Sequence, residues 1–263
     1  MTESSRFNTT PDERRLAIIL GWIAVAAVAH DFLLIPMRSH VLLQPWLLEQ
    51  SPGLVYGSLA DATTPGRAGG PWWASLVPST WWALGTLAIW VFIPRWLYGA
   101  GAVPRVRMAL PARGRDLGIY LALLLVMLPV LWVASRRPDF ASTYPLLSAN
   151  RVNAWTWPTL LGWWSAYVAI LFGTEYFFRG VLINALAPRL GWLSVGVSVI
   201  PYALIHTHKP LPEAFGAIVA GWVLGLLAWE TRSMLGGVLL HGAVAIAMDA
   251  MAMTATSRWP TGW

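Results

Sequence analysis

The chain contains no cysteine and few charged side chains. The absence of cysteine among its 263 residues excludes disulfides, thiolate metal sites and a cysteine nucleophile. Only 11% of the residues are charged, whereas a soluble domain normally carries about 25%. No basic stripe interleaved with aromatic residues is present, so we expect no nucleic acid partner. These absences argue against an ordinary soluble domain.

The chain is instead rich in long apolar runs. Hydrophobic residues make up 57% of the sequence, and a membrane-spanning helix needs about 20 such residues in succession. The pattern predicts an all-α, polytopic membrane helical bundle of about seven transmembrane helices. The expected spans are residues 15–36, 77–98, 117–135, 156–187, 191–207, 213–230 and 234–254.

The expected organisation has three parts. Residues 1–114 hold N-terminal transmembrane helices and a glycine- and proline-rich loop, residues 115–255 form the core, and residues 256–263 form a short tail. An arginine-rich loop at residues 95–115 is typical of the cytoplasmic side, which with seven helices places the N-terminus inside and the C-terminus outside. The net charge of +6 predicts contact with membrane lipid headgroups. The sequence does not indicate an oligomeric state.

Two features of the spans concern packing. The span at 156–187 is too long to cross a bilayer perpendicularly, which predicts a tilted helix or a break near Gly173 or Gly180. Gly221 and Gly225 lie four residues apart and would permit a close approach of helices within the chain.

One acid and one base interrupt the apolar pattern of the span at 156–187. Glu175 and Arg179 lie four residues apart, so they share a face of a helix and can form an ion pair. Ionisable groups at membrane depth are costly and mark functional sites. A buried salt bridge that orients two helix segments is the structural alternative.

Other polar residues follow in the apolar runs. His206 and His241 are proton acceptors or metal ligands, and polar side chains in membrane helices are satisfied most readily by meeting one another. We therefore expect both to converge on Glu175. Asp249 follows His241 by eight residues and falls on an adjoining face of the helix. His30 is interpreted as a packing residue.

Three of these segments resemble the motifs of a known family, the CPBP intramembrane peptidases, which include the CAAX prenyl proteases and the bacteriocin-processing (ABI) group. Residues 174–180, Thr-Glu-Tyr-Phe-Phe-Arg-Gly, resemble the first motif, Glu-Glu-x-x-x-Arg. Residues 202–206, Tyr-Ala-Leu-Ile-His, resemble the second, Phe-x-x-x-His, and His241 resembles the histidine of the third. The resemblance covers roughly residues 115–255 and implies an integral, multi-pass protein of a bacterial inner (plasma) membrane.

Family membership implies hydrolysis of a peptide bond within the bilayer, with water activated by a glutamate and a histidine. By this resemblance Glu175 matches the second glutamate of the first motif and Arg179 its arginine. His206 matches the water-activating histidine, and His241 the residue that stabilises the oxyanion. The implied substrate is a membrane-associated or lipidated protein, and no cofactor is implied.

The chain departs from the family pattern at two positions. Thr174 stands where the first glutamate, the general base, is expected, and Ala245 stands where the third motif has Asn or Asp. A subgroup with a Glu-Phe-Phe-Phe-Arg-Gly-like first motif is closer, since it continues with His-x-x-Lys-Pro-x-x-Glu and a late Asp. In that subgroup Lys209, Glu213 and Asp249 would support the site, and Glu213 could replace the missing base. An acid in the first helical turn and a lysine anchored at the interface are the structural alternatives for Glu213 and Lys209.

Three hypotheses therefore remain open. The first is a glutamic-type intramembrane endopeptidase. The second is a zinc metallopeptidase that uses His206, His208 and His241, which requires the helix to end before His208 because residues two apart otherwise point in different directions. The third is a membrane protein of the same fold without catalytic activity, such as a scaffold or an immunity factor.

Overall fold

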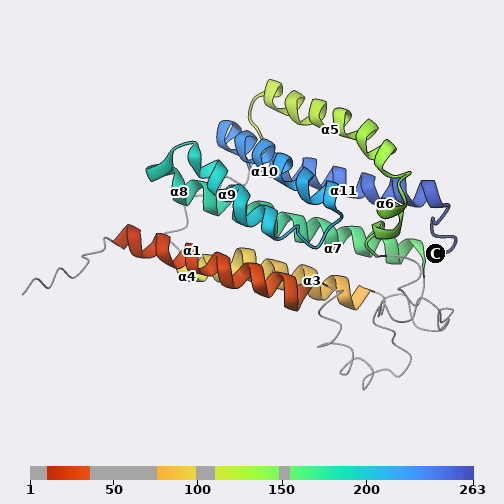
Figure 1. Cartoon of the computed structure of the whole chain (residues 1–263), viewed down its shortest axis with the longest axis horizontal. Coiled ribbons are helices and arrows are strands. Elements are labelled where there is room, and N and C mark those ends of the chain that lie inside the picture. Colours follow the sequence, from red (N-terminus) through yellow and green to blue (C-terminus); the bar gives the residue numbers. More distant parts are fainter. Residues whose placement is uncertain (1–10, 36–75, 99–109, 148–154) are drawn as a thin grey trace, which may run out of the picture.

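The structure, a computed structural model, describes residues 11–35, 76–98, 110–147 and 155–263 (Figure 1). Within these ranges the chain forms helices and no strand, which confirms the expected all-α bundle. The glycine- and proline-rich loop and the centre of the arginine-rich loop lie outside the described residues. Among the described residues, six helical segments are long and apolar enough to cross a membrane, namely Glu13–Leu34, Val77–Leu97, Gly114–Ala134, Trp157–Leu190, Leu211–Thr231 and Leu235–Thr256.

The fifth of the seven expected spans is shorter than predicted. Residues 191–207 contain α9 (Leu193–Leu204), a helix of 12 residues, which extends about 18 Å and so falls short of the ~30 Å hydrocarbon core of a bilayer. Residues 205–207 form a turn instead of continuing the helix. The expectation that the termini lie on opposite sides of the membrane depended on seven full spans and stays a prediction.

The other helical elements are named here with their bounds. They are α1 (Pro11–Ala29), η1 (His30–Leu34), α3 (Val77–Leu87), η4 (Ala88–Phe92), α4 (Ile93–Tyr98), α5 (Gly114–Ala134), α6 (Pro138–Thr143), α7 (Trp157–Glu175), η6 (Tyr176–Leu182), α8 (Ile183–Leu190), α10 (Leu211–Thr231) and α11 (Leu235–Thr256). The three η elements are π-helical turns within longer helices.

The central element is the long helix α7–η6–α8. In its most apolar window 78% of the residues are buried, compared with 11% for α5. The helix is continuous over Trp157–Leu190, so of the two expected alternatives, a tilted helix or a break near Gly173 or Gly180, the break is not present. The wider π-helical turn η6 contains Gly180 and changes the helix geometry locally. The turn begins directly after Glu175, the last residue of α7, and it carries Arg179.

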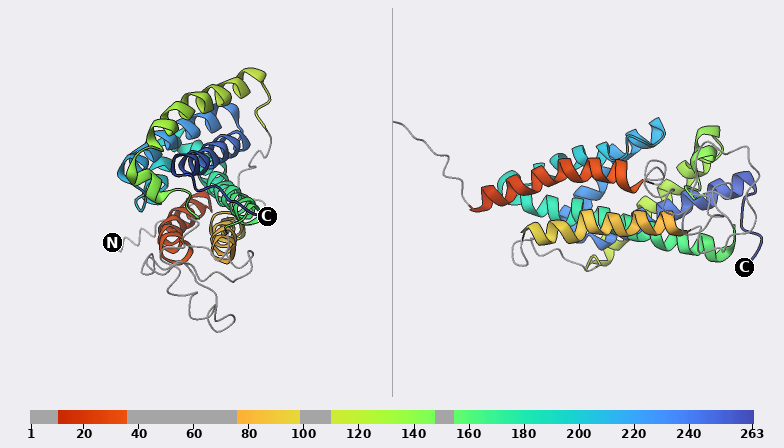
Figure 2. Two further views of the ribbon diagram at one scale, coloured as in Figure 1. Left: turned by 90° about the vertical axis from the view of Figure 1, so that its right-hand side faces the viewer. Right: turned by 90° about the horizontal axis from the view of Figure 1, so that it is seen from below.

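Helices pack on both sides of this central element. α3 contacts α7 from one side, where α1 and α4 lie next to it, and α11 contacts α7 from the other side and carries α5 on its outer face (Figures 1 and 2). α9 and α10 pack together, and α10 also contacts η6 and α11. The first residues of α11, the end of α7 and the end of α9 therefore meet beside η6.

Glycines allow the close approach of α9 and α10. A Cβ atom on Gly225 would lie 2.6 Å from Cγ1 of Val195, and one on Gly221 would lie 3.1 Å from the ring of Tyr202. This confirms the expected use of the two glycines for packing within the chain. Because neither glycine has a side chain, α10 can lie close to the end of α9 that carries Tyr202, next to the site described below.

Candidate active site

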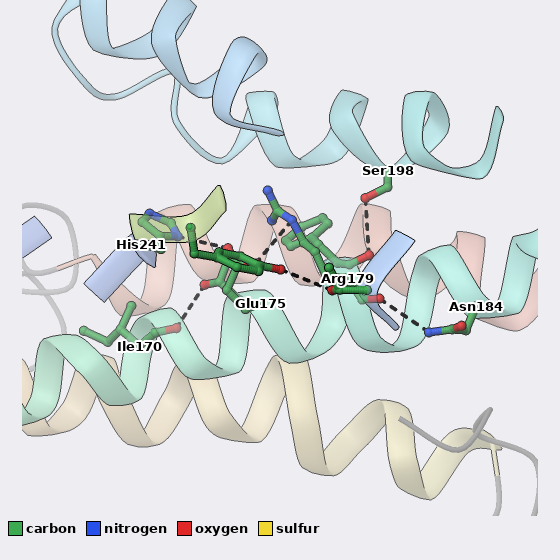
Figure 3. Close-up of polar contacts among 10 residues, drawn as sticks. Ile170, Glu175, Arg179, Asn184, Ser198 and His241 are labelled. Carbon is green, nitrogen blue, oxygen red and sulfur yellow. Dashed lines mark hydrogen bonds and ion pairs between the residues drawn. The ribbon is translucent and has the colours of Figure 1, made fainter. Parts of the chain in front are cut away.

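Glu175 and Arg179 form a buried ion pair at the junction of α7 and η6. Nε of Arg179 lies 3.3 Å from Oε2 of Glu175, and both side chains are almost fully enclosed by protein (Figure 3). The spacing in the sequence predicted this pair. An isolated charge would be costly in such surroundings, so each ion keeps the other charged.

Neighbouring side chains satisfy carbonyl groups of the π-helical turn. The amide of Asn184 donates to the carbonyl of Gly180 at 2.6 Å, and the hydroxyl of Ser198 donates to that of Phe178 at 3.3 Å (Figure 3). Because buried backbone carbonyls need hydrogen-bond partners, these contacts stabilise the irregular backbone that carries Arg179.

His241 approaches Glu175 from the other side. Nδ1 of His241 lies 2.9 Å from Oε1 of Glu175, so the carboxylate lies between the imidazole and the guanidinium (Figure 3). A carboxylate accepts hydrogen bonds, and Nδ1 of His241 therefore carries the proton. Glu175 thereby connects α7 to α11 and fixes the orientation of the His241 ring.

Tyr202 completes the contacts around Arg179. The guanidinium carbon lies 4.0 Å from the centroid of the Tyr202 ring, a cation–π geometry. The same ring lies 4.6 Å from that of His206 and 6.4 Å from that of His241, measured between centroids. The expected convergence of the two histidines on Glu175 is thus direct for His241 and runs through Tyr202 for His206.

The backbone sets the tautomer of His206. Nδ1 of His206 lies 2.7 Å from the carbonyl oxygen of Tyr202, and this oxygen can only accept. The neutral ring therefore carries its proton on Nδ1 and has a free lone pair on Nε2. Burial lowers the pKa of His206 well below its usual value, which keeps the ring neutral at physiological pH. His206 has the properties of a proton acceptor.

A cavity of about 340 Å³ lies beside these residues. Thr174, Tyr202, His206 and His241 line one part of it, together with Ala245, while apolar residues of α5, α10 and α11 line much of the rest. Glu175 and Arg179 are not among the lining residues. A molecule in the cavity would therefore contact His206 and His241 directly, and it would interact with Glu175 only through His241.

A second carboxylate does reach the cavity. Glu213, in the first turn of α10, lines it together with Lys209. Oε1 of Glu213 lies 3.4 Å from Nζ of Lys209 and accepts a 2.5 Å hydrogen bond from the hydroxyl of Tyr144. Burial raises the pKa of Tyr144 well above its usual value, so the phenol remains a donor. Oε2 of Glu213 is buried and has no hydrogen-bond partner in the part of the chain that the structure describes.

Thr174 does not supply a substitute for the missing carboxylate. Its hydroxyl donates to the carbonyl of Ile170 at 3.0 Å, one turn earlier in α7. Ala245 lines the cavity with a methyl group and offers no polar atom. The two departures from the family pattern thus both fall on the cavity wall.

Asp249 lies outside the cavity lining. Its Oδ2 accepts from the indole nitrogens of Trp163 at 2.8 Å and Trp164 at 3.2 Å, and its Oδ1 accepts from the backbone of Leu146 at 3.4 Å. These contacts hold α11 to α7 and to the segment after α6. From this position Asp249 supports the site through the placement of helices and does not take over a polar role at Ala245.

The histidines do not assemble a metal site among the described residues. No group of three or more His, Asp or Glu side chains in this part of the chain has a geometry that could hold a metal ion. α9 ends before His208, as the zinc hypothesis requires, but Nδ1 of His208 lies 3.9 Å from Oδ1 of Asp31 in η1. His208 thus contacts the N-terminal helix rather than His241.

Two residues near the cavity were not expected from the sequence. Tyr144 lies 65 residues from Lys209 and 69 from Glu213, and no local pattern indicates that the three meet. His30 lines the cavity although an isolated histidine in an apolar helix indicates packing. Its neighbour Asp31 was the only local signal, because a second polar residue at the same helix end is unusual.

Fold and site together define a class of protein. The described part of the chain holds six membrane-length helices and a buried Glu–Arg–His cluster beside a cavity with an imidazole acceptor, which is an arrangement suited to acid–base chemistry in a membrane. Residues 155–247 match the model of a family described as Rce1-like, the type II CAAX prenyl endopeptidases. The expected resemblance to the CPBP family is thereby confirmed for residues 155–247. Comparisons with curated proteins and with solved structures gave no match.

Proposed function

We propose that the protein is a glutamic-type intramembrane endopeptidase in which Glu213 and His206 activate water. The observation that carries this proposal is the composition of the cavity wall, where Glu213 and His206 are present and Glu175 is not. Oε2 of Glu213 is a buried acceptor without a partner, and a water molecule is the usual partner of such a group. In this proposal the carboxylate that holds the water lies at the start of α10 rather than in the first motif.

The proposed reaction uses the two histidines for different steps. The water donates one hydrogen bond to Oε2 of Glu213, and Nε2 of His206 takes its other proton while the oxygen attacks the peptide carbonyl carbon. His241, which Glu175 holds through Nδ1, stabilises the oxyanion. The carbon–nitrogen bond then breaks, and His206 returns the proton to the leaving amine. Arg179 keeps Glu175 ionised throughout.

The proposed substrate is a membrane-associated or lipidated protein. Apolar residues of three membrane helices line the cavity, so an apolar segment or a lipid chain could enter beside the polar residues. We further propose that the protein resides in a bacterial inner membrane, and that catalysis needs no cofactor.

The test is cleavage of a membrane peptide library in proteoliposomes, with prenylated and unmodified members, read by mass spectrometry. The wild type should cleave with or without a zinc chelator, and Glu213→Gln should be about 100-fold slower or more. Glu230→Gln is the matched control, because Glu230 is exposed at the other end of α10. Absence of cleavage of any member by the wild type would contradict the proposal, and inhibition by the chelator would favour zinc chemistry.

One observation supports a second candidate, a protein of this fold that has lost catalysis. The hydroxyl of Thr174 is occupied by the carbonyl of Ile170, and no carboxylate stands at this point of the cavity wall. We expect Thr174→Glu to raise the rate of cleavage about tenfold or more, because it places a second acceptor beside the water. Thr174→Gln introduces a side chain of the same size as Glu but without its charge, and it should not raise the rate of cleavage. An inert wild type together with an active Thr174→Glu would establish the second candidate.

A glycine on α11 sets the position of the Glu175 carboxylate. A Cβ atom on Gly237 would lie 2.9 Å from Oε2 of Glu175, closer than such atoms approach in proteins. We expect Gly237→Ala to displace the carboxylate and to lower the rate of cleavage about 100-fold, since His241 would shift with it. Gly242→Ala is the control, because its Cβ would meet only Val168, at 3.8 Å. Equal rates for the two variants would contradict the positioning role of Glu175.

A further inference from the structure

The N-terminal helices contribute a histidine to the cavity. His30, the first residue of η1, lines the cavity together with Trp82 of α3, although both lie outside residues 155–247. The side chain of His30 is 4% exposed in the whole structure. A packing role alone does not account for a polar ring on the wall of this cavity.

A hydrogen bond fixes which nitrogen of His30 carries the proton. Nε1 of Trp90 donates to Nδ1 of His30 at 3.2 Å, in buried surroundings. An indole N–H can only donate, so Nδ1 is unprotonated and the neutral ring has its proton on Nε2. His30 is thus a hydrogen-bond donor toward other groups, the opposite of His206, whose Nε2 is an acceptor.

The ring of Trp90 is itself held by the turn that carries Arg179. It lies 4.8 Å from the ring of Phe177 and 5.2 Å from that of Phe178, between centroids. These contacts join η4 to η6, while the hydrogen bond from Trp90 joins η4 to η1. All three elements are π-helical turns, a geometry that is frequent at functional sites. The position of His30 is therefore coupled to that of the Glu175–Arg179 pair.

Further contacts hold η1 in place. The indole of Trp81 donates to the carbonyl of Leu33 at 2.8 Å, and that of Trp22 donates to the carbonyl of Ile89 at 3.0 Å. Asp31 lies 3.9 Å from His208, in the turn that also carries His206. A donor held so firmly loses little conformational entropy when it binds a ligand.

We propose that His30 is a substrate-binding residue, whose Nε2–H donates to a backbone carbonyl oxygen of the peptide in the cavity. This inference rests on the proposed endopeptidase function. A peptide entering an apolar cavity leaves its carbonyl groups without water, and each needs a donor. His30 supplies one from the N-terminal helices, so the site extends beyond the region that the family model matches.

The first experiment measures the tautomer without reference to activity. The full-length protein, labelled with ¹⁵N-histidine in lipid bilayers, gives imidazole nitrogen shifts that distinguish Nε2–H from Nδ1–H. The His30 signal is assigned by its loss in His30→Gln. We expect Nε2–H in the wild type and a mixture of tautomers in Trp90→Phe, which removes the donor and keeps an aromatic ring. Nδ1–H in the wild type would overturn the proposal.

The second experiment measures cleavage of the same peptide library. His30→Phe should lower kcat/KM about 10- to 100-fold, the effect of losing a hydrogen bond to a buried group. His30→Gln should recover most of this loss, because its amide nitrogen can occupy the position of Nε2. Leu33→Ala is the control, since that side chain is 45% exposed on the same turn. Unchanged kcat/KM in His30→Phe, or equal losses in Phe and Gln variants, would overturn the donor role. Absence of cleavage by the wild type would instead overturn the proposed function, and the donor role with it.

Discussion

We expect the His206→Ala variant to lose essentially all cleavage. The Nδ1 proton of His206 is committed to the carbonyl of Tyr202, and burial lowers its pKa, so Nε2 is a fixed neutral acceptor on the cavity wall. Loss of such a general base slows a reaction about 10²- to 10⁴-fold. The loss should appear in kcat, measured in proteoliposomes, with the folded state verified by thermal unfolding of the purified variant.

His208→Ala is the matched control for this prediction. His208 also lines the cavity, two residues further along the turn, but its ring lies next to Asp31. We expect His208→Ala to retain most of the activity. Equal loss in both variants, with inhibition of the wild type by a chelator, would indicate a metal site. Full activity of His206→Ala would contradict its role as the base.

The second large effect is expected from Arg179→Met. Glu175 is fully buried, and its Oε2 lies 3.3 Å from Arg179. The substitution removes this cation and leaves the contact of the carboxylate with His241. Breaking one side of a buried pair costs about 3–5 kcal/mol. The variant should show a clearly lower Tm in detergent and little activity.

A double variant separates stability from function. Arg179→Met combined with Glu175→Leu removes both charges and should recover much of the lost stability, because apolar replacements of buried pairs are tolerated. It should remain inactive, since nothing then orients His241. Arg189→Met serves as the control, because Arg189 is exposed on α8. A wild-type Tm for Arg179→Met alone would show that the pair is not needed for folding.

Long apolar runs made most of the fold predictable. Six of the seven expected spans correspond to membrane-length helices, since length and hydropathy are local properties of the chain. The exception, α9, is apolar but ends at Leu204. The π-helical turn at Gly180 was not predicted, because such a turn depends on partners such as Asn184 and Ser198 that satisfy its carbonyls.

The site was predictable where its residues share a helix or a motif. The ion pair of Glu175 and Arg179 follows from their spacing. The approach of His241 was predicted because an unpaired polar side chain in a membrane helix is energetically costly. The meeting of Tyr144 with Glu213 could not be predicted, since it joins segments 69 residues apart. For the same reason His30 resembled a packing residue until its place on the cavity wall was known.

The membrane bundle, the family resemblance over the motifs and the ion pair could all be predicted from the sequence, because hydropathy, motif spacing and helical periodicity are properties of neighbouring residues. The packing of the helices was needed to show that Glu213 lines the cavity and Glu175 does not. Glu175 is enclosed by Arg179 and His241, whereas Glu213 lines the cavity wall. The tertiary structure also decided the tautomers of His30 and His206, because these depend on the donor or acceptor that each Nδ1 meets. Such contacts arise from the packing of helices distant in the chain, which no local pattern encodes.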